Sequence, residues 1–260
     1  MFGIKLKKKI EILKQFYGSL YRIFIIKLKI NFYIQKKCGN FFYLLHGYFF
    51  FFNLEKWTLS QKNKNFKKLI KSINSKSCFI DVGAHAGFFS IVASKKNKRL
   101  DIHSFEPSRN FFFLKNHIKY NNLKNISAQK LLVSNKNCKR EFYEQYVPSP
   151  TGSLLKKTTL KFTYTGTTID SYVKKKNIKP DIIKIDVEGD ELNVLLGAKQ
   201  TLMKFYPDIY LSYHPQIFEK YYSRYLFIKF IKELGYRIYN IENGFLNESI
   251  DKKTELFLKK

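Results

Sequence analysis

The chain has 260 residues and a formal net charge of +28, with 48 Lys and Arg residues against 20 Asp and Glu. This length suits one domain with an N-terminal extension, and it allows a sizeable buried core. A highly aromatic, uncharged run from Phe41 to Leu54 is shorter than the ~20 residues that a spanning helix needs, which excludes a clean transmembrane segment there.

The positive charge has two interpretations. One is an anionic partner, either nucleic acid or an acidic membrane surface. The other is biased composition, because Lys, Asn, Ile, Phe and Tyr, which share A/T-rich codons, are all abundant. Only six of the 48 basic residues are Arg, the better side chain for binding phosphates and bases. We therefore favour biased composition and do not expect a nucleic-acid partner.

The cysteines and the first residues indicate the cellular compartment in which the protein is expected. Cys38, Cys78 and Cys138 form no CxxC motif and no Cys/His pairing at zinc spacing. The first residues are basic, but no apolar region runs to a small-residue cleavage site, so we predict no secretory signal. We expect a reducing, cytoplasmic location, with peripheral membrane contact as an open alternative.

The N-terminal part alternates Lys with apolar residues to about residue 60, and helical periodicity is plausible from Leu6 to Leu28. A basic amphipathic helix followed by an aromatic segment could lie on an anionic bilayer. We favour the other interpretation, a helical layer that covers the main domain. Residues 61–77 predict a linker and a helix with the apolar residues Phe66, Leu69, Ile70 and Ile73. The expected division is an extension at 1–77 and a main domain at 78–260.

From Cys78 onward, strand and helix patterns alternate, which predicts a doubly wound α/β sheet. The expected main strands are residues 78–82, 101–105, 126–133, 181–187 and 209–213, with closing strands at 236–241 and 255–258. The expected helices are residues 88–96, 108–120, 169–177, 191–204 and 217–234. Residues 139–146 and 161–167 have the alternation of an antiparallel insertion.

The most informative stretch is CFIDVGAHAGFFS, residues 78–90. A buried-type strand carries Asp81, glycines follow at Gly83 and Gly87, and an apolar helical pattern then begins. This order brings backbone N–H groups and a helix N-terminus to one edge of a sheet, which is typical of nucleotide sites. The spacing matches neither GxGxxG nor a phosphate loop, so it indicates a nucleoside ligand. The alternative is a tight connection without a ligand.

Polar residues also follow the other strands, at the edge where open α/β sheets bind ligands. Glu106 lies 25 residues after Asp81, near the interval of roughly 20 at which a carboxylate accepts hydrogen bonds from ribose. Helix capping is the alternative for Glu106. Asp186 and Glu188 share one face, which is unfavourable unless a donor or a cation such as a sulfonium or a metal meets them.

These patterns together resemble the FkbM family of S-adenosylmethionine-dependent O-methyltransferases. The matching runs lie between residues 78 and 215: FIDVGAHAGFFS, SFEPSRNFFFLKNHIKYNNLKNI, TTIDSYVKKKNIKPDIIKIDVEGDELNVLLGAKQTL and the HP after the fifth strand. The resemblance implies a Rossmann-like, class I methyltransferase sheet of seven mostly parallel strands with helices on both faces. It implies S-adenosylmethionine as cofactor and a cofactor site made of Asp81, Gly83, His85, Gly87, Glu106 and Asp186.

In this resemblance, the turn from Gly83 to Gly87 packs on the methionine moiety and Glu106 holds the ribose. Asp186 and Glu188 would face the methyl group and the acceptor. The chain departs from the family at His85, where Asn is common, and at Ser212, where an acid is common. His214 then becomes the main candidate for a catalytic base, with an unperturbed pKa near ~6.5.

We expect His214, Asp186 and Glu188 to carry the catalysis. These residues could also bind a metal, but we favour a metal-free site because Ser212 removes a neighbouring acid. The expected acceptor is a hydroxyl group of a surface-glycan saccharide or of a small natural product. The rivals are an RNA or tRNA methyltransferase, and a non-catalytic scaffold with the same fold at a membrane surface.

Overall fold

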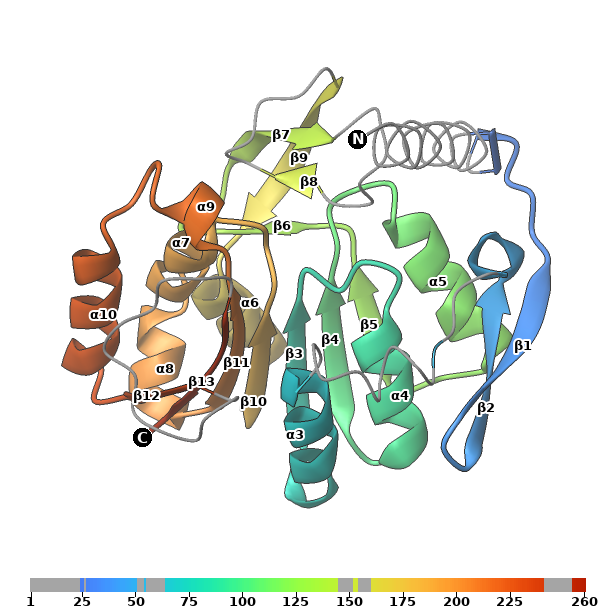
Figure 1. Cartoon of the computed structure of the whole chain (residues 1–260), viewed down its shortest axis with the longest axis horizontal. Coiled ribbons are helices and arrows are strands. Elements are labelled where there is room, and N and C mark those ends of the chain that lie inside the picture. Colours follow the sequence, from blue (N-terminus) through green and yellow to red (C-terminus); the bar gives the residue numbers. More distant parts are fainter. Residues whose placement is uncertain are drawn as a thin grey trace, which may run out of the picture.

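The computed structural model describes residues 24–25, 27–50, 54, 64–144, 152–153, 160–240 and 254–260. Its centre is a seven-stranded sheet in the order β12-β13-β11-β10-β3-β4-β5 (Figure 1). The strands are β3 (Cys78–Val82), β4 (Asp101–Phe105), β5 (Ile126–Gln129), β10 (Ile182–Ile185), β11 (Asp208–Tyr213), β12 (Arg237–Asn240) and β13 (Thr254–Lys259). Strand β13 is antiparallel to both neighbours and the remaining pairs are parallel. The predicted seven-stranded, mostly parallel α/β sheet is confirmed.

Helices cover both faces of this sheet (Figure 1). Ile80 and Ile183 point to the face covered by α6 (Ile169–Lys176), α7 (Glu191–Leu196), α8 (Lys199–Phe205) and α10 (Arg224–Glu233). Phe79 and Ile182 point to the opposite face, where α3 (Lys64–Ser72) and α4 (Phe88–Lys96) pack. Helix α5 (Phe111–Tyr120) joins α4 in a second cluster on this side. The apolar side chains that alternate along each strand therefore fill two cores.

Three predicted elements are divided in the structure. The expected strand 126–133 separates into β5 and β6 (Leu132–Val133), because β6 leaves the main sheet and pairs with β9 (Leu160–Thr167). The expected helix 191–204 breaks at Gly197, where a Cβ would lie 2.1 Å from the carbonyl oxygen of Ser134. The expected helix 217–234 separates into α9 (Pro215–Phe218) and α10.

The antiparallel insertion is present as predicted. Strand β7 (Lys139–Glu144) pairs with β9 in antiparallel register and also with the short β8 (Gly152–Ser153). The small sheet lies above the carboxyl ends of β3 and β10 (Figure 1). It therefore stands beside the edge where the candidate site residues were expected.

The N-terminal extension differs from the helical layer that we expected. Residues 33–46 form a hairpin of β1 (Tyr33–Cys38) and β2 (Phe41–His46), followed by the 3-10 turn η1 (Gly47–Phe49). Gly39 has a φ of +56° in the connecting turn, a conformation that glycine adopts without strain. Most of the predicted helix from Leu6 to Leu28 lies outside the described residues.

The hairpin packs on the main domain. Tyr43 and Leu45 are buried in one cluster with Phe88 of α4 and Phe113 of α5. The backbone N–H of Leu44 donates to the side chain of Asn121 at 2.9 Å. The hairpin thus covers α4 and α5. In the described part of the chain, no helix combines the length and apolar character needed to cross a membrane.

Candidate active site

The turn after β3 requires glycine at two positions. Gly83 has a φ of +73°, and a Cβ there would lie 2.0 Å from the carbonyl oxygen of Asp186. Gly87 has a φ of +85°, and a Cβ there would lie 2.5 Å from Leu114 Cδ1. The Gly83 N–H donates to the carbonyl of Phe105 at 3.0 Å. The two glycines therefore let the turn lie against β10 and α5 and bring the start of α4 to the sheet edge.

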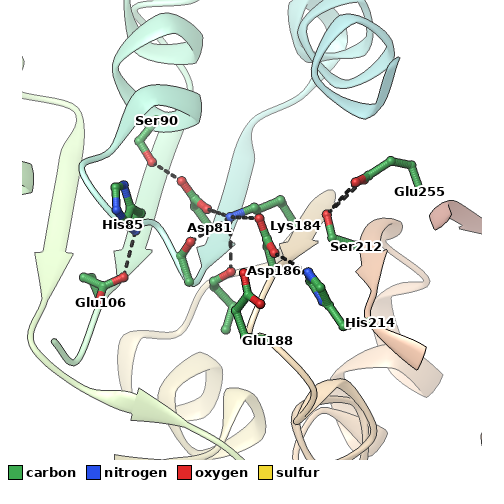
Figure 2. A network of polar contacts seen from close by, with 12 residues as sticks. Asp81, His85, Ser90, Glu106, Lys184, Asp186, Glu188, Ser212, His214 and Glu255 are labelled. Atoms are coloured by element: carbon green, nitrogen blue, oxygen red, sulfur yellow. Dashed lines mark hydrogen bonds and ion pairs between the residues drawn. The ribbon is translucent and has the colours of Figure 1, made fainter. Parts of the chain in front are cut away.

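Asp81 lies beneath this turn and is fully buried. The Ser90 hydroxyl donates to Asp81 Oδ2 at 2.6 Å, and Lys184 Nζ lies 3.2 Å from Asp81 Oδ1 (Figure 2). Lys184 also donates to the carbonyl of Gly83 at 2.8 Å. The structure places Asp81 against Ser90 and Lys184, and its predicted role as a cofactor residue stays a prediction.

Lys184 is a residue that the sequence analysis missed. It is buried, and its Nζ lies between Asp81 and Asp186, 3.9 Å from Asp186 Oδ2 (Figure 2). Burial alone would lower the pKa of Lys184, but the two carboxylates outweigh it and its pKa lies above the usual value. The available signal was a lysine in the apolar strand IIKI, two residues before an acid. Lys184 meets part of the negative charge for which we had expected a ligand cation or a donor.

Glu106 lies at the end of β4 and is buried. Its Oε2 accepts a 2.8 Å hydrogen bond from the backbone N–H of His85, and its Oε1 accepts one of 3.0 Å from the N–H of Ser108. The Ser108 hydroxyl also donates to Oε1, at 2.5 Å, so both lone pairs of Oε1 are used and a ribose hydroxyl would bind at Oε2. His85, with a φ of +54°, contributes through its backbone to the position of Glu106.

His214 follows β11 and is oriented by a residue that we did not predict, Glu191. His214 Nδ1 lies 2.8 Å from Glu191 Oε1, which also accepts from the N–H of Gly189 at 3.0 Å. Since a carboxylate accepts, Nδ1 carries the proton in the neutral ring and the Nε2 lone pair points into the site. An acid in the first turn of α7 was the only sequence signal for Glu191.

Asp186 and Glu188 flank the other ring nitrogen. His214 Nε2 lies 3.7 Å from Asp186 Oδ1 and 3.8 Å from Glu188 Oε1 (Figure 2). Burial alone would lower the pKa of His214, but its bond to Glu191 and the charges of Asp186 and Glu188 raise it above the ordinary value. The structure thus brings the three predicted catalytic residues together.

A carboxylate also lies beside Ser212, the position where the sequence departs from the family pattern. Ser212 Oγ donates to Glu255, with distances of 2.9 Å to Oε2 and 3.1 Å to Oε1 (Figure 2). Glu255 lies opposite Ser212 in the β11–β13 pair. Sequence reasoning missed Glu255 because it comes 43 residues later, on another strand.

The residues at this edge suit a cationic nucleoside. Gly83 and Gly87 keep side-chain atoms away from the turn after β3. Glu106 offers hydrogen-bond acceptors, and Asp186 and Glu188 add negative charge at the same edge of the sheet. A sulfonium is stabilised by nearby carboxylates, and ribose hydroxyls are bound by a carboxylate acceptor. The site therefore fits S-adenosylmethionine by its hydrogen-bond acceptors and its negative charge.

Comparison with known proteins agrees with this chemistry. The model of the "Methyltransferase FkbM domain" matches residues 81–238, more than half of the chain. A crystal structure of methyltransferase FkbM from Methylobacillus flagellatus has a TM-score of 0.48 and 17% identity, covering 71% of this chain and 44% of that one. The chain thus spans less than half of the Methylobacillus protein.

Two further solved structures are similar at lower identity. M. jannaschii TYW2 in complex with AdoMet has a TM-score of 0.42 and 14% identity, covering 88% of this chain and 84% of that one. The Pyrococcus abyssi tRNA (uracil-54, C5)-methyltransferase with S-adenosyl-L-homocysteine has a TM-score of 0.42 and 12% identity, covering 87% and 43%. A search of curated proteins finds no match. By the match of its domain, the chain belongs to the FkbM family of S-adenosylmethionine-dependent methyltransferases.

Proposed function

We propose that this protein transfers the methyl group of S-adenosylmethionine to a hydroxyl group of a saccharide, such as a surface glycan. The observation that carries the proposal is the convergence of Glu106, Asp186, Glu188 and His214 at the edge formed by the glycine turn. Carboxylates that suit a sulfonium nucleoside lie beside an imidazole and acids that suit a hydroxyl acceptor. A scaffold without activity has no need of this combination.

The cofactor, when bound, supplies an electrophilic methyl group on a positively charged sulfur. The chain's own residues hold donor and acceptor in line, and such positioning can lower a barrier by ~7–11 kcal/mol. Glu106 would hold the ribose and the turn from Gly83 to Gly87 would receive the methionine moiety. Asp186, anchored near Lys184, would set the negative potential beside the sulfur.

The acceptor side needs help because a sugar hydroxyl is a weak nucleophile. Promoting loss of its proton during attack is worth ~10²–10⁴-fold. We assign this task to the cluster of His214, Asp186 and Glu188, whose ring nitrogen and carboxylate oxygens converge. The C–S bond breaks as the C–O bond forms, and the products are the methyl ether, S-adenosylhomocysteine and a proton.

A saccharide acceptor is favoured by the extension. Exposed aromatic side chains of the hairpin include Tyr33 and Phe42, and Phe42 lies opposite the exposed Lys37. Rings stack on sugars, and lysines attract acidic or lipid-linked saccharides near a membrane. The same charge is the argument for an RNA acceptor, but the described surface carries few arginines for reading phosphates and bases.

The first test is calorimetric titration with S-adenosylhomocysteine. Wild type is expected to bind at micromolar concentration, and Glu106→Ala to bind at least tenfold more weakly because the ribose loses its acceptor. Glu233→Ala, on the exposed end of α10, is the matched control and should bind as wild type does. A folded wild type that does not bind would overturn the proposal.

The second test identifies the acceptor. Methyl-labelled donor is supplied with glycan fractions, including acidic and lipid-linked saccharides, and in parallel with RNA. Label that becomes a methyl ether on a sugar supports the proposal. Label recovered in RNA, with affinity that falls steeply as salt rises, would replace the saccharide with nucleic acid as the substrate class.

A further inference from the structure

His214, Asp186 and Glu188 have the arrangement of a metal-ligand set. Each offers one ligand atom, and these atoms all lie within 4.8 Å of one another. Metal–ligand bonds of about 2.0–2.2 Å place ligand atoms roughly 3 Å apart when adjacent and about 4 Å apart when opposite. The 3.7 Å and 3.8 Å distances from His214 Nε2 to the two carboxylates lie between these values. The three atoms therefore lie close enough for one ion to be bound by all of them once the side chains move together.

The ring nitrogen that faces this space has no hydrogen-bond partner in the described part of the chain. His214 Nε2 is buried, and the residue as a whole is only 5% exposed. A buried polar atom without a partner is unfavourable, and such an atom at a functional edge indicates a ligand. This nitrogen lies 3.7 Å from a carboxylate oxygen of Asp186 and 3.8 Å from one of Glu188, and a cation bound between the three atoms would supply the missing partner.

The rest of the histidine is built as in metal sites. A metal-bound imidazole usually donates its second N–H to a carboxylate, which fixes the ring and makes it a stronger ligand. Glu191 performs this task here: it is fully buried, and its Oε1 lies 2.8 Å from His214 Nδ1. A histidine that only closed a turn would not need a buried carboxylate behind it.

Lys184 leaves this space open. Its ammonium lies 3.9 Å from Asp186 Oδ2, whereas Asp186 Oδ1 is the oxygen that faces His214 (Figure 2). Lys184 is further bound to Asp81 and to the carbonyl of Gly83, beneath the turn. The lysine therefore balances one side of Asp186, and the other side is directed at the proposed ion.

A second cluster in the described residues, Cys78, Asp101 and His103, lacks these properties. Both ring nitrogens of His103 already have partners, Asp101 at 3.0 Å and the Tyr172 hydroxyl at 3.0 Å. Burial raises the pKa of the Cys78 thiol to about 12, so the thiolate that a metal needs is disfavoured. This cluster is a suitable negative control.

We infer that His214, Asp186 and Glu188 bind one divalent metal ion of the Mn²⁺ type, held by one nitrogen and two carboxylate oxygens. Mixed imidazole and carboxylate ligands suit divalent first-row ions. This replaces the metal-free site favoured from the sequence. The inference deepens the proposed function: an acceptor hydroxyl coordinated to the ion has a lowered pKa and releases its proton to water as methyl transfer proceeds.

The test uses the full chain and Mn²⁺ alone, without cofactor or acceptor. Free Mn²⁺ is followed by electron paramagnetic resonance during titration, and Zn²⁺ and Mg²⁺ are tested by competition. Wild type is expected to bind one ion. His214→Ala and Glu188→Gln should each weaken binding at least tenfold. Glu191→Gln should weaken it 10- to 100-fold, the usual effect of removing a carboxylate behind a metal-bound histidine.

The controls separate a specific site from surface binding. Asp101→Asn and His103→Gln should leave Mn²⁺ affinity unchanged, and far-UV circular dichroism shows whether each variant keeps its fold. A folded wild type that binds none of the three ions would overturn the inference, as would binding that His214→Ala and Glu188→Gln leave unchanged. Specific Mn²⁺ binding without any S-adenosylhomocysteine binding would instead leave the metal site standing and refute the proposed function.

Discussion

The α-carbon of Gly83 faces the backbone carbonyl of Asp186 so closely that a Cβ on residue 83 would lie 2.0 Å from the carbonyl oxygen. This contact joins the turn after β3 to the end of β10, and it makes the two halves of the candidate site depend on each other. No side chain fits at residue 83, because the turn packs directly against the backbone of Asp186.

Gly83→Ala is therefore expected to cost more than backbone strain alone. Gly39→Ala is the matched control, since Gly39 also has a positive φ, +56°, but nothing lies within 4 Å of its Cβ position. The control should lose about 1–2 kcal/mol of unfolding free energy and keep its S-adenosylhomocysteine affinity. Gly83→Ala should lose more stability and bind at least tenfold more weakly. Urea unfolding and calorimetry measure both, and equal effects of the two substitutions would contradict the close contact.

Lys184→Met is expected to destabilise the fold strongly. Lys184 is buried with the fully buried Asp81, so removing the ammonium leaves a carboxylate without its counter-charge, at a cost of ~3–5 kcal/mol. Asp81→Asn in the same chain should restore part of the loss. Urea unfolding of the two single variants and the double variant gives the coupling, expected to exceed about 1 kcal/mol.

The control for this cycle is the exposed pair Lys229 and Glu233, 3.9 Å apart on α10. Lys229→Met should change the unfolding free energy very little, because water already screens exposed pairs. Additive effects at Lys184 and Asp81 would show that the two side chains do not depend on each other.

The sequence predicts the sheet well because the signals for it are local. A short, largely apolar run such as residues 78–82 that ends at a glycine favours a buried strand, and the glycine turn after it indicates the edge of the sheet where a ligand would bind. The breaks at Gly197 and after β5 are not local: they follow from contacts with Ser134 and from the pairing of β6 with β9. Likewise, the hairpin in the extension is fixed by its packing on α5.

The candidate site divides in the same way. The residues that follow strands were found from spacing, since parallel strands end at one edge. The partners that orient these residues were missed. In the sequence, Lys184 looks like one residue of a strand and Glu191 like an acid at a helix start. Glu255 lies on the last strand of the chain, far in sequence from Ser212. Such supporting residues are defined by burial and distance, which a single sequence does not contain.

The buried, neutral ring of His117 should make the protein less stable in mild acid. It is fully buried, and its ring accepts the N–H of His46 at Nε2 (2.9 Å) and binds the carbonyl of Ala86 through Nδ1 (2.7 Å), an arrangement of the neutral ring. Burial lowers its pKa to about 3. In the unfolded chain the His117 ring has a pKa of ~6.5, so it is protonated there at a higher pH than in the folded protein. The contribution of His117 to the free energy of unfolding is therefore complete above pH 6.5 and is lost as pH falls toward 3.

Between pH 7.5 and pH 5, wild type should lose about 2 kcal/mol of unfolding free energy through His117. His117→Gln removes the titrating group and should show a correspondingly flatter pH dependence in urea unfolding, although its stability at pH 7.5 is lower. The His117 ring signals in NMR should not titrate above pH 5. A ring that titrates near pH 6.5 in the folded protein would refute the burial argument.

The hairpin predicts binding to anionic membranes. Lys37 and Phe42 are cross-strand partners, so their side chains share one face, and Tyr33 lies on the same face of β1 by strand alternation. Tyr33 and Phe42 are 58% and 54% exposed. Aromatic rings insert at a bilayer interface, and each lysine near an anionic surface contributes about 1 kcal/mol to the binding free energy.

We expect the protein to sediment with vesicles that contain phosphatidylglycerol and not with neutral phosphatidylcholine vesicles. Phe42→Ser and Lys37→Gln should each weaken binding about fivefold. Tyr225→Ser, an equally exposed aromatic on α10, is the control and should leave it unchanged. Equal binding to neutral vesicles, or equal effects of all three substitutions, would mean that this face does not contact lipid.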